Sequence, residues 1–444
     1  MKKPNFFGPV RILLFLTLAF SSFVFVNGQT ATAGSDVSEF NVNGMKVLIK
    51  RRPGTPTVSA GLFFRGGVRN TTADNAGIEG LTLSSATEGS KLFPRQKLRK
   101  ETSRVGTVIS SGSSFDYSVL AMQSTKTNFD ISWQMFVDVI LNPAFAPEDV
   151  ARVKDTILTG LKSQNDSPEG TLEDQNQKVL FAGHPYSNDA DGTIDSITKL
   201  KPADLAAYHK TLLLASRMLL VVVGDVEPAA LQKQIAEAFG KVPKGDYKDT
   251  ALPALDFSKP SVDIAAKPVQ TDYVKGSFSA PSIKDPDYYA MRAAITILQS
   301  NVFQEVRTKR NLSYAPDATL DERAVNTGSI SVSSTNPTES VKVMLEEIRK
   351  LREDPIDEEE IGRMSGFFLT TYYLGQETNA AQAKELAQYE LIGGGWRRSL
   401  EFLDRIQKVK PEEVKAVANK YMKNLRFVVV GNTADVDKNI FLQK

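Results

Sequence analysis

The side chains that most often carry metal or nucleophilic chemistry are scarce in this sequence. Among 444 residues there are two histidines, His184 and His209, and no cysteine. Without cysteine the chain forms no disulfide, zinc ribbon, iron–sulfur cluster, thiol nucleophile or lipid-anchored N-terminal cysteine. Two histidines also leave little for a multi-histidine metal site. Because isolated histidines seldom act as ligands, we expect His184 to order its loop and His209 to lie part-exposed on a helix.

Other clusters of reactive residue types have simpler explanations. Residues 110–114 are rich in serine but have no histidine base nearby in sequence, so they are predicted to form a strand and turn. The acidic run 357–360 follows Pro355 and suits a helix N-terminus, where it complements the helix dipole. Residues 393–395 are three glycines before Trp396, a helix-to-helix loop. The chain contains no G-x-S-x-G, phosphate-binding or dinucleotide fingerprint.

The N-terminus has the pattern of a secretory signal peptide, predicted over residues 1–28. Three basic residues precede an apolar stretch at residues 12–26, and small residues follow it. Cleavage is expected near residues 26–28 or 31–33. An uncleaved anchor is the less favoured alternative, because the stretch is shorter than the ~20 residues that span a bilayer. We therefore expect export without stable membrane insertion, most simply to the periplasm, with secretion as the alternative.

The charge of the exported chain is close to neutral. Removing Lys2, Lys3 and Arg11 takes the formal net charge from +2 to −1. This balance argues against nucleic acid or an anionic surface as a partner. The composition, 41% hydrophobic and 24% charged, is that of an ordinary globular protein.

The sequence repeats itself once. Residues 197–205 resemble residues 406–414, and each segment leads through a helix to an apolar strand ending in glycine, LLVVVG at 219–224 and RFVVVG at 426–431. The offset is 209 residues at the first match and 207 at the last. Tyr208 and Tyr421 stand 213 apart and are not expected to be equivalent. The order and offset favour a duplicated domain over chance matches.

The domains are predicted at 36–242 and 263–444, with a proline-bearing linker at 243–262. Strands and helices alternate irregularly, which favours an α+β fold of two homologous domains, each a mostly antiparallel sheet packed with helices. Expected strands are Met45–Arg51 and residues 58–64, 115–123, 269–279 and 328–334. Helices are expected from Pro147 and over residues 341–351 and 361–373.

One segment of the first half resembles a known motif. Residues 76–90, AGIEGLTLSSATEGS, follow Phe64-Arg65-Gly66-Gly67 and resemble the inverted zinc-binding helix of the pitrilysin/insulinase, or mitochondrial-processing-peptidase-like, metallopeptidases. In active members this helix carries H-x-x-E-H. Residues 112–117 resemble the strand after that helix, and His184-Pro185-Tyr186 resembles a recurrent loop. The resemblance covers essentially the whole mature chain and implies the two-domain fold.

This chain departs from the family pattern at each metal position. The positions of the two histidines are Gly80 and Ser84, and that of the glutamate is Leu83. The third ligand position falls near Gly160 and its acidic companion near Val153. Glycine and leucine supply no ligand or base, and a serine hydroxyl is a poor zinc ligand. The resemblance therefore predicts no metal and no cofactor in this chain.

The second half keeps a different pair of family residues. Residues 305–314, EVRTKRNLSY, resemble a segment that usually reads R-x-x-x-G-L-x-Y, so Arg307 and Tyr314 match its arginine and tyrosine. Asn311 replaces the glycine, a mild change because asparagine also ends helices in the left-handed conformation. The preceding loop at 299–301 is expected to be short. Without the resemblance, Arg307 would be a solvated helix residue and Tyr314 a strand residue half in the core.

The resemblance implies a protein that is inactive alone. In two-chain bacterial members one subunit carries the zinc helix and the other the arginine–tyrosine pair. We expect a non-catalytic subunit of an exported zinc peptidase, with zinc on a homologous H-x-x-E-H partner and an unfolded peptide as substrate, bound partly by strand addition. Arg307 and Tyr314 would hold the peptide and stabilise its oxyanion. The alternative is an inactive homologue with a structural or peptide-binding role. An unrelated periplasmic binding protein is disfavoured by the internal repeat.

Overall fold

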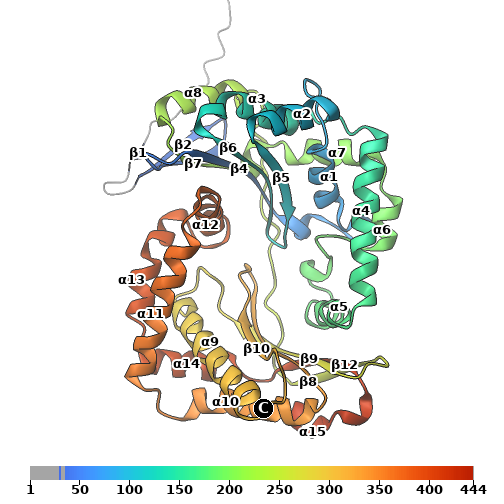
Figure 1. The fold of residues 1–444 in the computed structure, drawn as a ribbon, viewed down its shortest axis with the longest axis vertical. Helices are drawn as coiled ribbons and strands as arrows, with labels where there is room; N and C mark the ends of the chain where they lie inside the picture. The colour runs from blue at the N-terminus through green and yellow to red at the C-terminus, as the bar shows by residue number, and fades with distance from the viewer. Residues whose placement is uncertain (1–29, 32–35, 444) are drawn as a thin grey trace, which may run out of the picture.

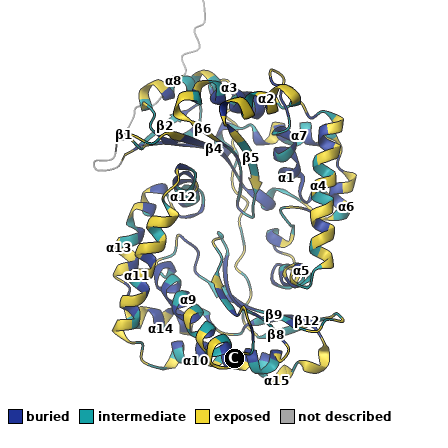
Figure 2. Ribbon diagram, in the orientation of Figure 1, coloured by how far each residue is buried: buried dark blue, intermediate teal, exposed yellow. Residues whose placement is uncertain are grey.

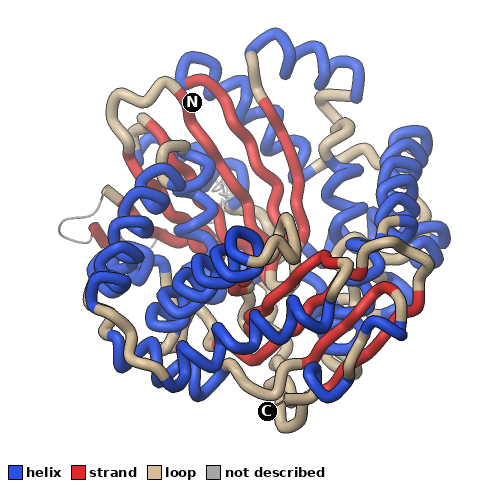
Figure 3. The backbone as a smooth tube through the Cα atoms, turned by 60° about the horizontal axis from the view of Figure 1, so that its bottom comes forward, coloured by secondary structure: helices blue, strands red, loops and turns tan. Residues whose placement is uncertain are grey.

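The computed structural model describes residues 30–31 and 36–443, so the predicted signal peptide lies outside the described residues. Two α/β layered units lie one above the other, joined by a long connection that passes between them (Figure 1). In a tilted view the strands of the two units form separate sheets with helices around them (Figure 3). Within the described residues, none of the helices combines the length and the apolar character needed to cross a membrane.

The first unit contains a seven-stranded sheet in the order β1-β2-β3-β7-β4-β6-β5. Its strands are β1 (Thr30–Ala31), β2 (Val37–Val42), β3 (Met45–Arg51), β4 (Thr57–Arg65), β5 (Val108–Ser113), β6 (Tyr117–Thr125) and β7 (Met218–Gly224). Its helices are α1 (Ile78–Ala86), α2 (Arg95–Val105), α3 (Phe129–Leu141), α4 (Pro147–Asp166), α5 (Pro168–Leu180), α6 (Ile194–Lys199), α7 (Pro202–Leu212) and α8 (Pro228–Phe239). Neighbouring strands are antiparallel except for β3 and β7.

The second unit contains a five-stranded sheet in the order β10-β11-β9-β12-β8. Its strands are β8 (Ser261–Ala266), β9 (Asp272–Ala280), β10 (Asp317–Leu320), β11 (Asn326–Ser334) and β12 (Arg426–Gly431). Its helices are α9 (Tyr288–Val302), α10 (Pro337–Glu353), α11 (Glu358–Gly375), α12 (Asn379–Ile392), α13 (Phe402–Gln407), α14 (Pro411–Tyr421) and α15 (Lys438–Phe441), and α9 continues as a π-helix, η6 (Phe303–Lys309). Here β12 and β8 are the parallel pair.

The two sheets share one topology. Read from the parallel edge, the first runs β3-β7-β4-β6-β5 and the second β8-β12-β9-β11-β10, and the parallel pair occupies the same place in both. The matching strands β7 and β12 are the LLVVVG and RFVVVG segments of the sequence repeat. The predicted α+β fold with two homologous domains is therefore confirmed. Residues 243–260 contain no helix or strand, and β8 begins at Ser261, inside the segment predicted as linker.

The apolar runs of the repeat become interior strands whose side chains enter hydrophobic clusters on both faces of each sheet. Every residue of β7 is buried, which is why this strand reads as continuous Leu and Val rather than as an alternating pattern. Exposed residues gather on the outward faces of the surrounding helices, including α4 (Figure 2). The strand expected at 269–279 is shorter than expected, because β9 begins at Asp272.

Each domain also packs one helix onto the other domain's sheet. From the first domain, α5 lies against β9 and β12, where Ser277 Oγ donates to Asn176 Oδ1 at 3.0 Å. From the second domain, α12 lies against β4 and β7, where Asn379 Nδ2 donates to the carbonyl of Thr57 at 2.6 Å (Figure 1). Because α5 and α12 hold the same place in the repeat, the exchange is reciprocal and joins the two halves at two points.

Candidate functional site

The helix matching the family's zinc motif is α1, and it lies directly against the edge strand β5. Ser84 Oγ lies 3.0 Å from Ser111 Oγ. A Cβ atom placed on Gly80 would lie 2.7 Å from Ser113 Oγ and 3.3 Å from the carbonyl of Ala190. The two small helix residues and the two serines of β5 therefore let helix and strand approach closely. This approach fills the space in which two histidine rings would need to stand.

The remaining positions of the motif do not fit a metal either. Leu83 is fully buried and belongs to the core of the first domain. Gly160 lies on α4, and a Cβ atom there would meet nothing within 4 Å. The cavity that remains beside α1, lined by Gly77, Ser113 and Asp189 among others, has about 10 Å³, close to the smallest space that holds one water. Among the described residues, no group of three or more His, Cys, Asp or Glu could hold a metal ion. The residues present do not fit zinc.

A buried ion pair, in place of a metal, links α1 to the rest of the first domain. Glu79, next to Gly80, accepts hydrogen bonds from Arg217 Nη2 at 2.7 Å, Tyr208 Oη at 2.6 Å and Ser118 Oγ at 2.5 Å. Burial raises the pKa of Glu79, and the Arg217 charge and these hydrogen bonds counteract it. Burial and the neighbouring carboxylate also raise the pKa of Tyr208, which keeps its hydroxyl a donor. This cluster could not be predicted from local sequence, because Glu79 and Arg217 are 138 positions apart.

The two histidines have structural partners. His184 Nδ1 accepts from the backbone N–H of Tyr186 at 3.0 Å, and its Nε2 lies 3.1 Å from the carbonyl of Pro253. His184 therefore orders its own loop, as predicted, and also contacts the linker at Pro253. His209 lies on α7, but the expectation that it is part-exposed is wrong. It is buried, with Nε2 2.8 Å from the carbonyl of Ile140, and burial lowers its pKa.

Arg307 and Tyr314 are brought together in the second domain. Arg307 lies on the π-helix η6, and its guanidinium carbon is 4.0 Å from the centroid of the Tyr314 ring and 4.8 Å from that of Phe303. The alternative in which Tyr314 is half in the core is wrong, because 79% of this residue is exposed. Asn311 has φ of 50°, the left-handed conformation expected from its place in the motif. The loop expected at 299–301 is absent, because these residues belong to α9.

The charged side chains near this pair form ion pairs with one another and not with Arg307. The nearby carboxylate of Glu305 is held by Lys309 Nζ at 2.5 Å and by Arg310, and these hydrogen bonds lower the pKa of Glu305 to about 2. Within the described part of the chain, no carboxylate forms an ion pair with Arg307. Its guanidinium, half-buried over the rings of Phe303 and Tyr314, therefore has no carboxylate of the described residues competing for its donors. The chain pairs a closed metal position in one domain with an accessible arginine–tyrosine pair in the other.

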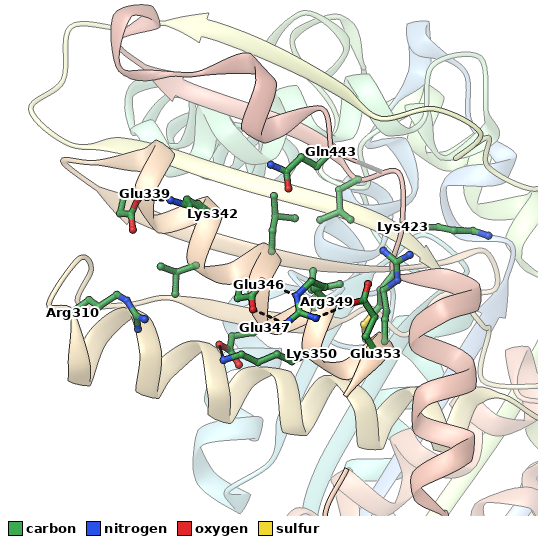
Figure 4. A pocket seen from close by; sticks show the side chains of 16 residues that line it. Arg310, Glu339, Lys342, Glu346, Glu347, Arg349, Lys350, Glu353, Lys423 and Gln443 are labelled. Carbon is green, nitrogen blue, oxygen red and sulfur yellow. Dashed lines mark hydrogen bonds and ion pairs between the residues drawn. The ribbon is translucent and has the colours of Figure 1, made fainter. Parts of the chain in front are cut away.

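A large cavity along α10 offers no comparable chemistry. It has about 550 Å³ and is lined by alternating acidic and basic side chains (Figure 4). Arg349 is paired with Glu346 and Glu353, each at 2.7 Å, and Lys350 with Glu347 at 2.7 Å. Since these charges neutralise one another, the cavity does not present a set of groups directed at a ligand.

Comparison with known families places this arrangement in a class. The model of the insulinase family (peptidase family M16) matches residues 46–193, and the model of the peptidase M16 inactive domain matches residues 199–365. The chain belongs to the insulinase/pitrilysin-type metallopeptidase family.

Individual relatives span most of the chain. An "uncharacterized zinc protease" of Mycobacterium tuberculosis is 25% identical over 393 residues, which cover 84% of this chain and 88% of the relative. Cytochrome b-c1 complex subunit 1 of Bos taurus is 22% identical over 259 residues, or 58% of this chain and 54% of the relative.

Solved structures share the fold. A peptidase M16 inactive domain from Pseudomonas fluorescens has a TM-score of 0.83 at 21% identity, covering 90% of this chain and 98% of that one. A protease from Helicobacter pylori has a TM-score of 0.81 at 18% identity, covering 89% of this chain and 99% of that one.

Proposed function

We propose that this chain is the non-catalytic subunit of an exported, periplasmic heterodimeric zinc peptidase. A homologous partner chain with H-x-x-E-H would supply the zinc and the general base. The observation that carries the proposal is the contrast between the two domains. The metal position around Gly80 is closed by β5, whereas half-buried Arg307 and exposed Tyr314 stand together, and no carboxylate of the described residues is ion-paired with Arg307.

The chemistry of the pair suits peptide hydrolysis by a complex. The guanidinium of Arg307 donates fixed hydrogen bonds to a peptide carbonyl, and the hydroxyl of Tyr314 donates to the oxyanion that forms as the peptide is attacked. Loss of one such donor typically lowers the rate by ~10²–10³.

The edge strand β5 supports binding of an unfolded peptide by strand addition. Among the strands that the structure describes it pairs with β6 alone, and Val108 on it is 57% exposed. The corresponding edge strand β10 is closed, because Gln299 Oε1 accepts from the N–H of Ala318 at 2.5 Å. An extended peptide would therefore add its backbone to the first sheet.

Reconstitution tests the proposal. The partner would be recovered by purifying the native protein from the envelope fraction, where a one-to-one complex with an H-x-x-E-H chain is expected. The purified chain alone should hold no stoichiometric zinc and cleave no peptide, and the complex should cleave. Arg307→Ala and Tyr314→Phe should lower turnover by ~10²–10³ without weakening assembly. Arg349→Ala and Tyr373→Phe are matched controls, since Arg349 is paired with Glu346 and Glu353 on α10 and Tyr373 is an exposed tyrosine of α11.

A second candidate is an inactive homologue with a structural or peptide-binding role. The closed metal position supports this second candidate as much as the first. The bovine relative is named as a subunit of the cytochrome b-c1 complex and not as a protease. Unchanged turnover in both Arg307 and Tyr314 variants would favour this candidate. A zinc-dependent activity of the isolated chain would refute both.

A further inference from the structure

A second large cavity lies beside the arginine–tyrosine pair. It has about 540 Å³, within the ~300–1,000 Å³ typical of ligand pockets, and lies between α9, η6 and α11. None of the residues assigned above to peptide hydrolysis lines it. The cavity is therefore separate from the pair and has to be judged by its own lining.

The lining of this cavity is apolar inside and polar at the rim. Buried apolar side chains line it from three elements: Ile295 and Ile297 of α9, Ala318 of β10 and Met364 of α11. At the rim stands Phe367, a large ring that is 54% exposed, with amide and hydroxyl groups around it, among them Gln299, Ser300, Asn301 and Gln304. An apolar interior with a few polar groups at the mouth suits a large apolar group attached to a polar chain.

Phe303 connects the cavity to the pair. Its ring lines the cavity, and the guanidinium carbon of Arg307 lies 4.8 Å from the ring centroid. Successive residues of an extended peptide advance by about 3.3 Å. A peptide whose carbonyl is held by Arg307 would thus place the side chain of a residue about two positions away at the mouth of the cavity.

We propose that this cavity, which we call the Phe303 pocket, binds a large apolar side chain of the peptide substrate close to the bond held by Arg307 and Tyr314. The inference rests on the proposed function and narrows its substrate class to unfolded peptides with an aromatic or long aliphatic residue at that point.

The charges and hydrogen bonds of the pocket favour this occupant. The lining carries two charged side chains, Arg363, which is paired with Glu359 at 2.9 Å, and Glu360, which is hydrogen-bonded to Asn301, so Arg363 faces two carboxylates. An anionic side chain would be repelled there. Backbone pairing is also excluded at this place, because the outward N–H of Ala318 is already bonded to Gln299. A side chain, rather than an added strand, is what the pocket accepts.

The test measures binding by the isolated mature chain, without any partner. Short labelled peptides of Gly, Ser, Thr and Asn would carry one guest residue, Phe, Leu, Ala or Asp, and dissociation constants would be compared by fluorescence anisotropy. We expect the Phe and Leu peptides to bind about 10- to 100-fold more tightly than the Ala peptide, as burial of such a side chain implies, and the Asp peptide to bind no better than Ala.

Two variants test whether the preference for the Phe peptide over the Ala peptide arises at the Phe303 pocket. Phe367→Ala removes the exposed rim ring, and Thr296→Phe fills the pocket from α9. Both should bring the Phe-to-Ala preference close to one while leaving the affinity for the Ala peptide unchanged. Leu369→Ala is the control, since Leu369 is also an exposed apolar residue of α11, at 38%, but does not line the pocket.

The outcomes separate the pocket from the proposed function. A preference for Phe that survives Phe367→Ala and Thr296→Phe, or a wild-type chain that binds all guests equally, overturns the pocket while leaving the subunit role intact. Absence of any peptide binding overturns both the pocket and the peptide-binding role of the pair. A preference lost in both pocket variants and kept in Leu369→Ala supports the assignment.

Discussion

Restoring the metal motif with Gly80→His, Leu83→Glu and Ser84→His is expected to give an unstable chain that still holds no zinc. The instability has a geometric reason, and the missing zinc has a second one, because the third ligand position near Gly160 still lacks a ligand. Gly80 and Ser84 face Ser113 and Ser111 across the close contact between α1 and β5. Two imidazole rings need the space that β5 now fills.

The size of the effect follows from the burial of the three positions. Leu83 is fully buried in the first core, so its replacement loses about 1.5–3 kcal/mol of apolar burial. A carboxylate left there costs several kcal/mol more. A Cβ at residue 80 would lie 3.3 Å from the backbone carbonyl of Ala190 and would force Ser113 Oγ, at 2.7 Å, to rotate away, and the imidazole beyond it would overpack this contact at a cost of about 1–3 kcal/mol. The total is roughly 5–10 kcal/mol, comparable to the whole stability of an ordinary domain.

Urea unfolding and metal analysis after dialysis against zinc would check this prediction. Gly160→Glu is the matched control, because a Cβ at Gly160 meets nothing within 4 Å and the change replaces a helical glycine. This single variant should be neutral or gain up to about 1 kcal/mol. A triple variant that folds with wild-type stability and retains one zinc per chain would refute the account of the closed site.

Three further predictions concern stability. Glu79→Ala leaves Arg217 buried without its partner and should cost about 3–5 kcal/mol in urea unfolding, and a loss below about 1 kcal/mol would contradict the role given to this pair. Burial raises the pKa of Glu385 on α12 from 4.5 to about 7, against the opposing charge of Lys50. Its stabilising contribution is therefore complete below pH 4.5 and is lost as the pH rises through 7, so Glu385→Gln should raise the melting temperature at pH 8 more than at pH 5, and equal shifts would argue against this. Asn311→Ala should cost about 1–2 kcal/mol because of the left-handed backbone, whereas Asn311→Gly should be nearly neutral in the same unfolding assay.

Much of the fold could be predicted because both copies of the repeat contain an apolar run that indicates a buried strand. The strands β7 and β12 are interior strands of their sheets with side chains buried on both faces, and they therefore read as nearly continuous apolar runs. Strands that are short or partly polar contain no such continuous apolar run and are harder to predict from the sequence. β8 carries no fully buried residue and was not predicted, whereas the serine-rich β5 was predicted only from residue 110 onward, as a strand and turn.

The candidate site was predicted in part. The resemblance pointed to Arg307 and Tyr314, and the structure brings them into contact, which no spacing argument alone guarantees. The contribution of Phe303 was missed, because its role depends on the π-helix η6 and on the neighbouring α11. The extent of α9 through 299–301 was also missed, since a family loop was expected there.

By itself the sequence determined which chemistry this chain lacks. Residue types cannot be changed by folding, so Gly80, Leu83 and Ser84 exclude the family's zinc ligands whatever the conformation. The tertiary structure decided what took their place: a close contact between α1 and β5, and a buried pair between Glu79 and Arg217. It also decided that Tyr314 faces solvent beside Arg307 and a cavity. These features depend on segments far apart in the chain, whose approach is set by packing rather than by local sequence.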